Sequence, residues 1–211
     1  MPRTSSQNRA IREAKTQSIL EVALELFALH GFDKVSIDQI ADACKMSHGL
    51  FYHYFSSKNE ILENLVTDYG NKFSQNLLNR YKQGDEGEVF IKKSLNLFLN
   101  NVNSNKRNCY YASLFIDTSL VKLNEDLDTP IFDRELENVL NKSLKIIKKE
   151  TSNFSQKEFD SFLYLFFIYL KGYVDAKLKY PNLVKNEPSA DDLLRLINYG
   201  LKGSSDNQEI D

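Results

Sequence analysis

Apolar residues recur along the first part of the chain at the spacing of an amphipathic helix. Ile19, Val22, Leu26 and their apolar neighbours fall at i, i+3, i+4 and i+7, which places them on one helix face. Gly31 follows the stripe, and a glycine here is typical of a left-handed helix C-cap. The segment up to Lys15 precedes the stripe and carries several cations, so we expect a basic arm there.

Two short helices joined by a tight turn are predicted next. Ser36 and Gln39 have the spacing of a capping box, which predicts a helix over Ser36–Cys44. Lys45 lies in the turn, and a second helix, capped by its own first residue, is expected over Ser47–Tyr54. This pair matches a helix-turn-helix. Its second helix is short enough to lie in the major groove of DNA, which is ~12 Å wide.

The rest of the chain also has the polar and apolar pattern of helices. Capping residues, polar breaks and prolines set their bounds, which are Ser57 to about Tyr81, Glu88 to about Val102, Tyr110 to Val121, Thr129 to about Lys149, Ser155 to Tyr180, and Ser189 to Lys202. The sequence therefore predicts an all-α fold. We expect a helix-turn-helix DNA-binding domain over residues 1–57, a second helical domain over 58–203, and a disordered tail over 204–211.

Composition narrows the class of protein. Hydrophobic residues make up 42% of the 211 residues and charged residues 27%, values typical of a globular protein. The net charge is −2, so any nucleic acid must be bound by a local basic surface. The first residues lack the apolar core of a signal peptide. The longest apolar run, Phe162–Leu170, is about half of the ~20 residues that span a bilayer, so we expect a cytoplasmic protein without membrane contact.

The sequence lacks the motifs and residue spacings that are typical of enzyme active sites. The His and Cys residues have no metal-ligand spacing, and neither a glycine-rich phosphate loop nor a Gly-x-Ser-x-Gly motif is present. Carboxylates are interleaved with lysines, as on solvated helix faces. We therefore expect no catalytic activity, no metal and no cofactor.

The second short helix and its surroundings hold the candidate contacts to double-stranded DNA. Side chains with hydroxyl, imidazole or ammonium groups suit phosphates, Gly49 allows a close backbone approach, and Leu50 faces the bases. For His48 and His53, the alternative to DNA contact is a histidine that is exposed and merely solvated. Phe51 and Phe55 are expected to point inward. The candidate DNA-binding residues are Ser36, Lys45, Ser47, His48, Gly49, Leu50, Tyr52, His53 and Lys58.

The stretch from Ser18 to Val66 resembles the DNA-binding domain of the TetR/AcrR (tetracycline-repressor-like) family. The resemblance rests on Ile19–Phe27, Gly31–Phe32, Ser36–Ala41, Ser47–Phe55 and Lys58–Leu62, in register and without a gap. It implies that the helical domain over 58–203 is a ligand-binding and dimerisation domain. It also implies a one-component bacterial transcriptional regulator that usually represses and is released from DNA by a small molecule.

The chain departs from this family's pattern at three positions. Lys45 stands where the turn usually has glycine, His48 where lysine or arginine is usual, and Leu50 where threonine or serine is usual. These departures bear on the operator sequence rather than on the mode of binding.

The helix predicted before Pro181 is apolar on all sides, which indicates burial within one subunit or between two. The resemblance implies that this helix and the last one form a four-helix bundle with their copies in a homodimer. The last helix would contribute Leu193, Leu194, Ile197 and Leu201. Two reading helices would then lie about one DNA turn, ~34 Å, apart on an inverted-repeat operator.

Surplus aromatic residues are candidates for an inducer pocket. They are Phe98, Tyr110, Tyr111, Phe115, Phe162, Phe166, Tyr169 and Tyr173. Cys109 joins this set, because Lys106 and Arg107 at an expected helix start favour a lowered thiol pKa. Thiol sensing and a buried structural cysteine stay open for Cys109, and Cys44 is expected to serve packing. A helical adaptor protein that does not read DNA is the remaining alternative.

Overall fold

The structure, a computed structural model, describes residues 4–80, 88–124, 155–182, 184 and 186–195. The described residues form helices and their connections, which confirms the predicted all-α class. The helices are α1 (Ser5–His30), α2 (Ile37–Ala43), α3 (His48–Phe51), α4 (Lys58–Arg80), α5 (Glu88–Ser104), α6 (Lys106–Asn124) and α8 (Gln156–Lys179), with a short helical segment at 190–195. The helix expected over Thr129–Lys149 lies outside the described residues.

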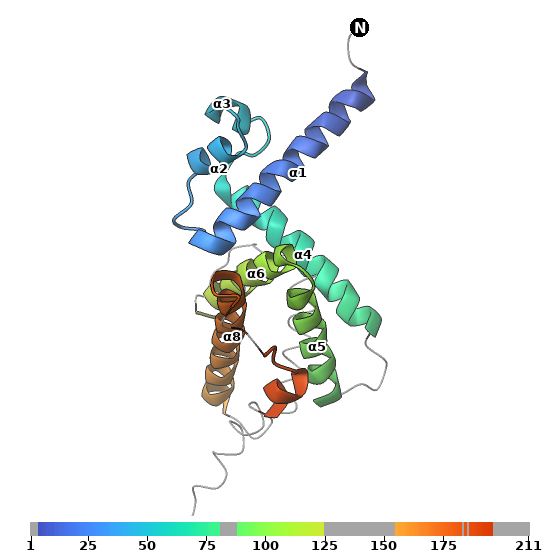
Figure 1. Cartoon of the computed structure of the whole chain (residues 1–211), viewed down its shortest axis with the longest axis vertical. Helices are drawn as coiled ribbons and strands as arrows, with labels where there is room; N and C mark the ends of the chain where they lie inside the picture. The colour runs from blue at the N-terminus through green and yellow to red at the C-terminus, as the bar shows by residue number, and fades with distance from the viewer. Residues whose placement is uncertain (1–3, 81–87, 125–154, 183, 185, 196–211) are drawn as a thin grey trace, which may run out of the picture.

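The helices are arranged as a head and a body (Figure 1). We call α1, α2 and α3 the head, and α5, α6 and α8 the body. Helix α4 begins in the head and runs along the body, and α6 packs against α1, α4, α5 and α8. Buried apolar residues form one cluster that extends from Ile19 in the head to Leu170 in the body. The head is therefore joined to the body by packed helices.

Helix α1 is longer than the apolar stripe predicts. The Thr4 hydroxyl accepts a hydrogen bond from the Gln7 amide and the Gln7 side chain accepts one from the Thr4 amide, so a capping box begins the helix at Ser5. The basic segment is thus helical rather than a loose arm. Gly31 ends the helix with a φ of 86°, which glycine adopts at little cost.

The helix-turn-helix is held by the caps that the sequence predicts. The Ser36 hydroxyl accepts from the Gln39 amide at 3.2 Å, and the Ser47 hydroxyl accepts from the Leu50 amide at 3.3 Å. The second helix is shorter than predicted: α3 ends at Phe51, and residues 52–54 form a turn. Backbone bonds between residues three apart tighten this last turn and redirect the chain into α4.

One helix start in the body differs from the sequence prediction, and another agrees with it. Helix α6 begins at Lys106, because the Asn105 side chain accepts from the Asn108 amide at 2.8 Å and acts as a cap. The last helix is described over 190–195, where the amide of Asp192 donates to the Ser189 hydroxyl at 3.1 Å. Both starts depend on short polar side chains that bond to the backbone locally.

The expected partners of the last helix are wrong for two residues. Leu193 and Leu194 are 2% and 4% exposed and belong to the core of their own chain, because the 190–195 segment folds back onto the body. Ile197 and Leu201 lie outside the described residues. None of the helices in the described part of the chain has an apolar stretch long enough to cross a membrane.

Candidate nucleic-acid interface

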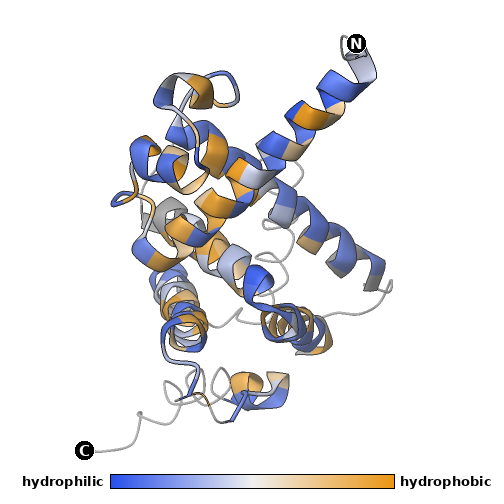
Figure 2. Cartoon of the chain, turned by 45° about the horizontal axis from the view of Figure 1, so that its top comes forward, coloured by the Kyte–Doolittle hydropathy of each residue, from blue (hydrophilic) through white to orange (hydrophobic). Residues whose placement is uncertain are grey.

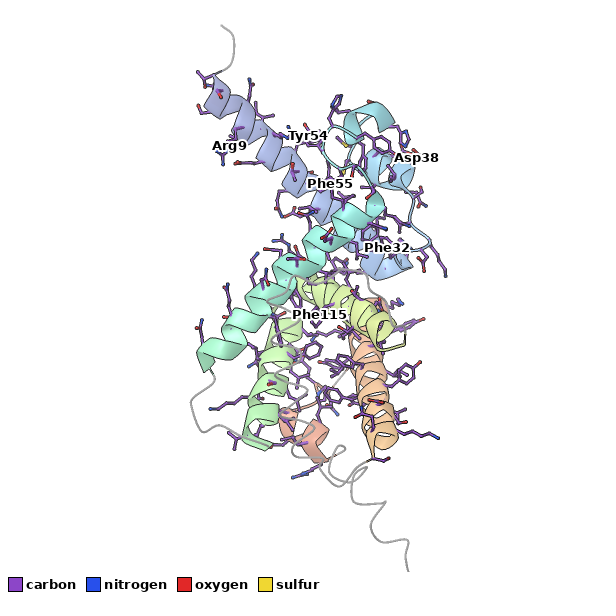
Figure 3. The ribbon with its side chains drawn as sticks, turned by 180° about the vertical axis from the view of Figure 1, so that it is seen from behind. Arg9, Phe32, Asp38, Tyr54, Phe55 and Phe115 are labelled. Atoms are coloured by element: carbon purple, nitrogen blue, oxygen red, sulfur yellow. The ribbon has the colours of Figure 1, made fainter. Side chains whose placement is uncertain are left out.

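The inner side of α3 is bound to the head by two phenylalanines. Phe51 is fully buried and Phe55 is 4% exposed, and their ring centroids lie 6.4 Å apart. They pack with Ile40 and Ala41 of α2 in the buried cluster, as expected (Figure 3 labels Phe55). One side of α3 is therefore packed against the head, and the other side faces solvent.

The outer side of α3 presents the candidate base and phosphate contacts. Leu50 is 43% exposed and Tyr52 is 48% exposed, and His48 and Gly49 are exposed beside them. The Ser47 hydroxyl oxygen is occupied by the Leu50 amide, but its own O–H stays available to donate. These residues, Ser47 to Leu50 and Tyr52, form one exposed surface that a DNA groove can accept, and we call it the reading surface.

The turn between α2 and α3 accommodates a lysine where the family usually has glycine. Lys45 has a φ of 53°, the left-handed region that costs a non-glycine residue roughly 1 kcal/mol. Its amide donates to the Asp42 carbonyl at 2.9 Å, and the Met46 amide donates to the Ala41 carbonyl at 3.0 Å. The Lys45 side chain is exposed at the edge of the reading surface.

His48 has a partner that sequence reasoning missed. Its Nε2 lies 3.0 Å from Oδ1 of Asp38 on α2, and its ring meets the Tyr52 ring edge-on at 5.0 Å. The Asp38 carboxylate therefore holds the imidazole in place on the reading surface. A carboxylate here disfavours a phosphate and suits the amino group of a cytosine.

Two cations of α1 bind carbonyl groups of the helix-turn-helix. Arg12 donates to the carbonyl of His53 at 3.3 Å, and Lys15 donates to the carbonyl of Cys44 at 3.2 Å. Lys15 thereby lies at the C-terminal end of α2, where the helix dipole favours a positive charge. The basic segment thus helps to position α2 and α3. The His53 side chain itself is exposed.

Lys58 fastens the start of α4 to the loop after α1. Its Nζ donates to the carbonyls of Phe32 and Val35 at 2.7 and 3.0 Å, and it lies 4.2 Å above the centre of the Phe32 ring. The sequence instead predicts that Lys58 contacts a DNA phosphate. The ammonium is directed into the protein, so its observed role is in the architecture of the head.

Replacing Lys58 by methionine should lower the free energy of unfolding by about 1–3 kcal/mol, since two carbonyl groups lose a charged donor. Urea denaturation followed by circular dichroism measures this. Lys34, exposed in the same loop, is the control, and Lys34→Met should change stability by less than about 0.5 kcal/mol. Equal effects of the two substitutions would contradict the assignment.

The candidate pocket residues are divided between different surroundings. The buried ones are Phe98, Tyr110, Tyr111 and Phe115; Phe166 and Tyr173 are half-buried, Tyr169 is exposed, and the side chain of Phe162 lies outside the described residues. Among the side chains that the structure describes, the set is thus divided between buried and more exposed positions.

Tyr69 of α4 joins two of these candidates, and sequence reasoning missed it. Its ring stacks on Tyr111 with centroids 5.4 Å apart and lies 5.7 Å from Phe115, and its hydroxyl donates to Asn101 at 3.0 Å. Burial raises the pKa of the Tyr69 hydroxyl, which stays protonated. The available signal in the sequence was that Tyr69 falls at an apolar position of the predicted helix. Only the packing shows that this position contacts Tyr111 and Phe115 of α6.

Tyr110 lies between head and body rather than facing a pocket. Its hydroxyl donates to Oε1 of Glu25 in α1 at 2.7 Å. Arg107 of α6 also pairs with Glu21 of α1 at 3.3 Å. Charged and polar groups of α6 thus contact α1 directly. Tyr173 has another surrounding, because its hydroxyl donates to Asn103 at 2.8 Å.

The expectation of a lowered Cys109 pKa is wrong. The thiol is 2% exposed and lies 3.8 Å from the carbonyl of Val174, and burial raises its pKa to about 11 despite the nearby Lys177 and Lys171. Lys106 and Arg107 extend toward α1 instead. At neutral pH the thiol is protonated, so its surroundings are those of a structural cysteine.

In the described part of the chain, no three His, Cys, Asp or Glu side chains are grouped so that they could hold a metal ion. Cys44 is buried, and burial also raises the pKa of its thiol.

Comparisons with known proteins agree with this geometry. Residues 19–65 match the model of the bacterial regulatory proteins of the tetR family. YuxN of Bacillus subtilis, described as an uncharacterized helix-turn-helix transcriptional regulator, is 36% identical over 92 residues, which are 44% of this chain and 32% of that protein. The matched part thus spans about a third of the length of this relative.

Solved structures with low sequence identity share the fold of this chain. A TetR-like transcriptional regulator from Rhodococcus sp. RHA1 aligns with a TM-score of 0.59 at 18% identity, covering 98% of this chain and 100% of that one. AibR in complex with isovaleryl coenzyme A and operator DNA aligns with a TM-score of 0.52 at 15% identity, covering 90% and 97%. The N-terminal domain is thus similar in sequence to the tetR family of bacterial regulatory proteins, and the chain is similar in fold to these solved structures.

Proposed function

We propose that this chain is a transcriptional regulator that binds an inverted-repeat operator as a homodimer, represses, and is released by a small apolar or aromatic molecule. The observation that carries the proposal is α3, whose inner side is fixed by Phe51 and whose outer side exposes Leu50 and Tyr52. The chemistry of this surface suits base edges and phosphates. AibR, which shares the fold, is described in complex with both a ligand and operator DNA, which supports a regulator with two binding sites.

A second copy of the chain is the proposed partner of α8. Leu170 and Val174 of this helix are buried against the body, but another side exposes Tyr164, Leu165, Ile168 and Tyr169. Leu165 is 65% exposed, and the four residues together form an exposed apolar strip, a kind of surface that marks protein–protein contacts. Pairing these strips would bury them and place two heads on one duplex. The homodimer supplies the symmetry that an inverted repeat requires.

Helix α4 is the proposed link between inducer and DNA. Its start is fastened to the head by Lys58, and further along Tyr69 stacks on Tyr111 of α6. A ligand held among the body helices that displaces α6 would therefore move α4 and the head together. The ligand must bind the released state more tightly than the DNA-bound state for this to work.

Selection from a pool of random duplexes tests DNA reading. We expect an inverted repeat to be enriched, bound by a dimer, with affinity that falls steeply between ~50 and ~200 mM salt. Screening compounds for release of the selected duplex then identifies the inducer. A monomeric protein that enriches no duplex would refute the proposal and leave the adaptor interpretation.

Two neighbouring substitutions separate sequence reading from phosphate binding. Leu50→Ala should change which bases are preferred, whereas Tyr52→Ala should weaken all duplexes alike. Fluorescence anisotropy with the selected duplex and with single-base variants of it measures both. The reverse pattern would overturn the assigned roles.

A further inference from the structure

The first ten residues of α1 project from the head as an exposed helix, in which Arg12 bonds to the carbonyl of His53. Residues 4–14 are all exposed, whereas buried residues of α1 begin at Ile19. Figure 1 shows this end of α1 extending past α2 and α3, away from the body. At 1.5 Å per residue, ten residues extend the head by about 15 Å.

The surface of this projection is polar and positively charged. Residues 4–15 contain three cations, Arg9, Arg12 and Lys15, and one carboxylate, that of Glu13, while Ile11 is their one large apolar side chain. Figure 2 shows hydrophilic residues over much of this end of α1. Such a surface offers little to an apolar partner and is complementary to a polyanion. It is a local concentration of positive charge in a chain whose net charge is −2.

The projection begins at the edge of the reading surface. Arg12 donates to the carbonyl of His53, the residue after Tyr52. An open hollow of about 480 Å³ lies here, lined by Arg9, Arg12, Glu13, Thr16 and Gln17. A DNA duplex that receives α3 in its groove therefore brings its sugar–phosphate backbone close to this hollow.

We propose that the projecting segment of α1 is a second DNA contact, in which Arg9 binds a backbone phosphate beside the half-site. The inference rests on the proposed DNA binding and adds a site outside α3. Arg9 now pairs with Glu13 at 2.8 Å, and its side chain is 83% exposed. Such an exposed pair contributes little to stability, so Arg9 exchanges the carboxylate for a phosphate at low cost. Arg12 keeps the segment in position.

The test compares Arg9→Gln and Glu13→Gln on the selected duplex, with affinity measured by fluorescence anisotropy across a salt series. Arg9→Gln should reduce the slope of log K against log salt by about 0.9, which is about an eightfold loss of affinity at ~0.1 M salt. Preference among single-base variants of the duplex should stay the same, because a phosphate contact carries no sequence information. Glu13→Gln should instead strengthen binding.

The two substitutions break the same ion pair, so they separate a phosphate contact from support of the helix. Weaker binding by both variants would mean that only helix stability matters, and would overturn the inference. Lys72→Gln is the matched control, since Lys72 on α4 pairs with Asp68 four residues earlier and is 70% exposed. Its salt slope should equal that of the unmodified chain.

Failure of this inference is distinguishable from failure of the proposed function. If the unmodified chain binds no duplex, the proposed function fails. If it binds the selected duplex and Arg9→Gln leaves the salt slope unchanged, DNA binding through α3 stands and the α1 contact is refuted.

Discussion

Replacing Phe51 by alanine should lower the free energy of unfolding by about 3–5 kcal/mol and abolish DNA binding. Phe51 is fully buried in the core of the head, and it is the buried residue of α3. A four-residue helix has too few internal bonds to persist without its packing. Urea denaturation measures the stability, and anisotropy with the selected duplex measures the binding.

The adjacent residue provides the control for this prediction. Leu50→Ala removes a side chain of similar apolar character that is 43% exposed, so it should change stability by less than about 1 kcal/mol. The Leu50 variant should still bind DNA, with altered base preference. If Phe51→Ala retained full affinity, the α3 backbone would not depend on the head core, and the geometry described here would be wrong.

Replacing Lys171 by methionine should lower the free energy of unfolding by about 2–4 kcal/mol at neutral pH. Its Nζ lies 2.6 Å from the Ser113 hydroxyl, 2.8 Å from Asp117 and 3.0 Å from Asp175, between α6 and α8. The Lys171 side chain is 20% exposed, so most of its charge is shielded from water. Without it, two neighbouring carboxylates lose the cation between them.

The deficit of the Lys171 variant should shrink as the pH is lowered. Burial raises the pKa of Asp117 and Lys171 lowers it, so removing Lys171 raises that pKa further. A carboxyl group whose pKa is raised in the folded state binds a proton there more readily than in the unfolded chain. It therefore destabilises the fold as the pH rises through the folded-state pKa, and the variant recovers stability below it.

Lys179 is the matched control, since it also pairs with Asp175 but is 41% exposed, at 3.3 Å. Lys179→Met should cost less than about 1 kcal/mol and show little change with pH. Denaturation of both variants at pH 5 and pH 7 makes the comparison. If the Lys171 variant lost the same free energy of unfolding at both pH values, the carboxylates of Asp117 and Asp175 would not interact with Lys171 as described.

Sequence reasoning was successful where structure depends on neighbours within a few residues. The caps at Ser36 and Ser47 and the end of α1 at Gly31 follow from side chains that bond to the adjacent backbone. The inward Phe51 and outward Leu50 follow from the helical period. The capping box at Thr4 was also legible in this way, and its omission led to the expectation of a loose arm.

Tertiary structure decided the roles that depend on residues far apart in the chain. Lys58 is engaged by carbonyl groups 26 and 23 residues earlier, and Cys109 is covered by a carbonyl group 65 residues later. The local charges that predicted a low thiol pKa are present, but packing directs them to α1 and leaves desolvation as the larger effect. By itself, then, the sequence determined most of the described helices, their caps and the resemblance of the head to the tetR family. Which charges face solvent was set by the packing of α6 against α1 and α8, because burial and pairing depend on the neighbours that folding brings together.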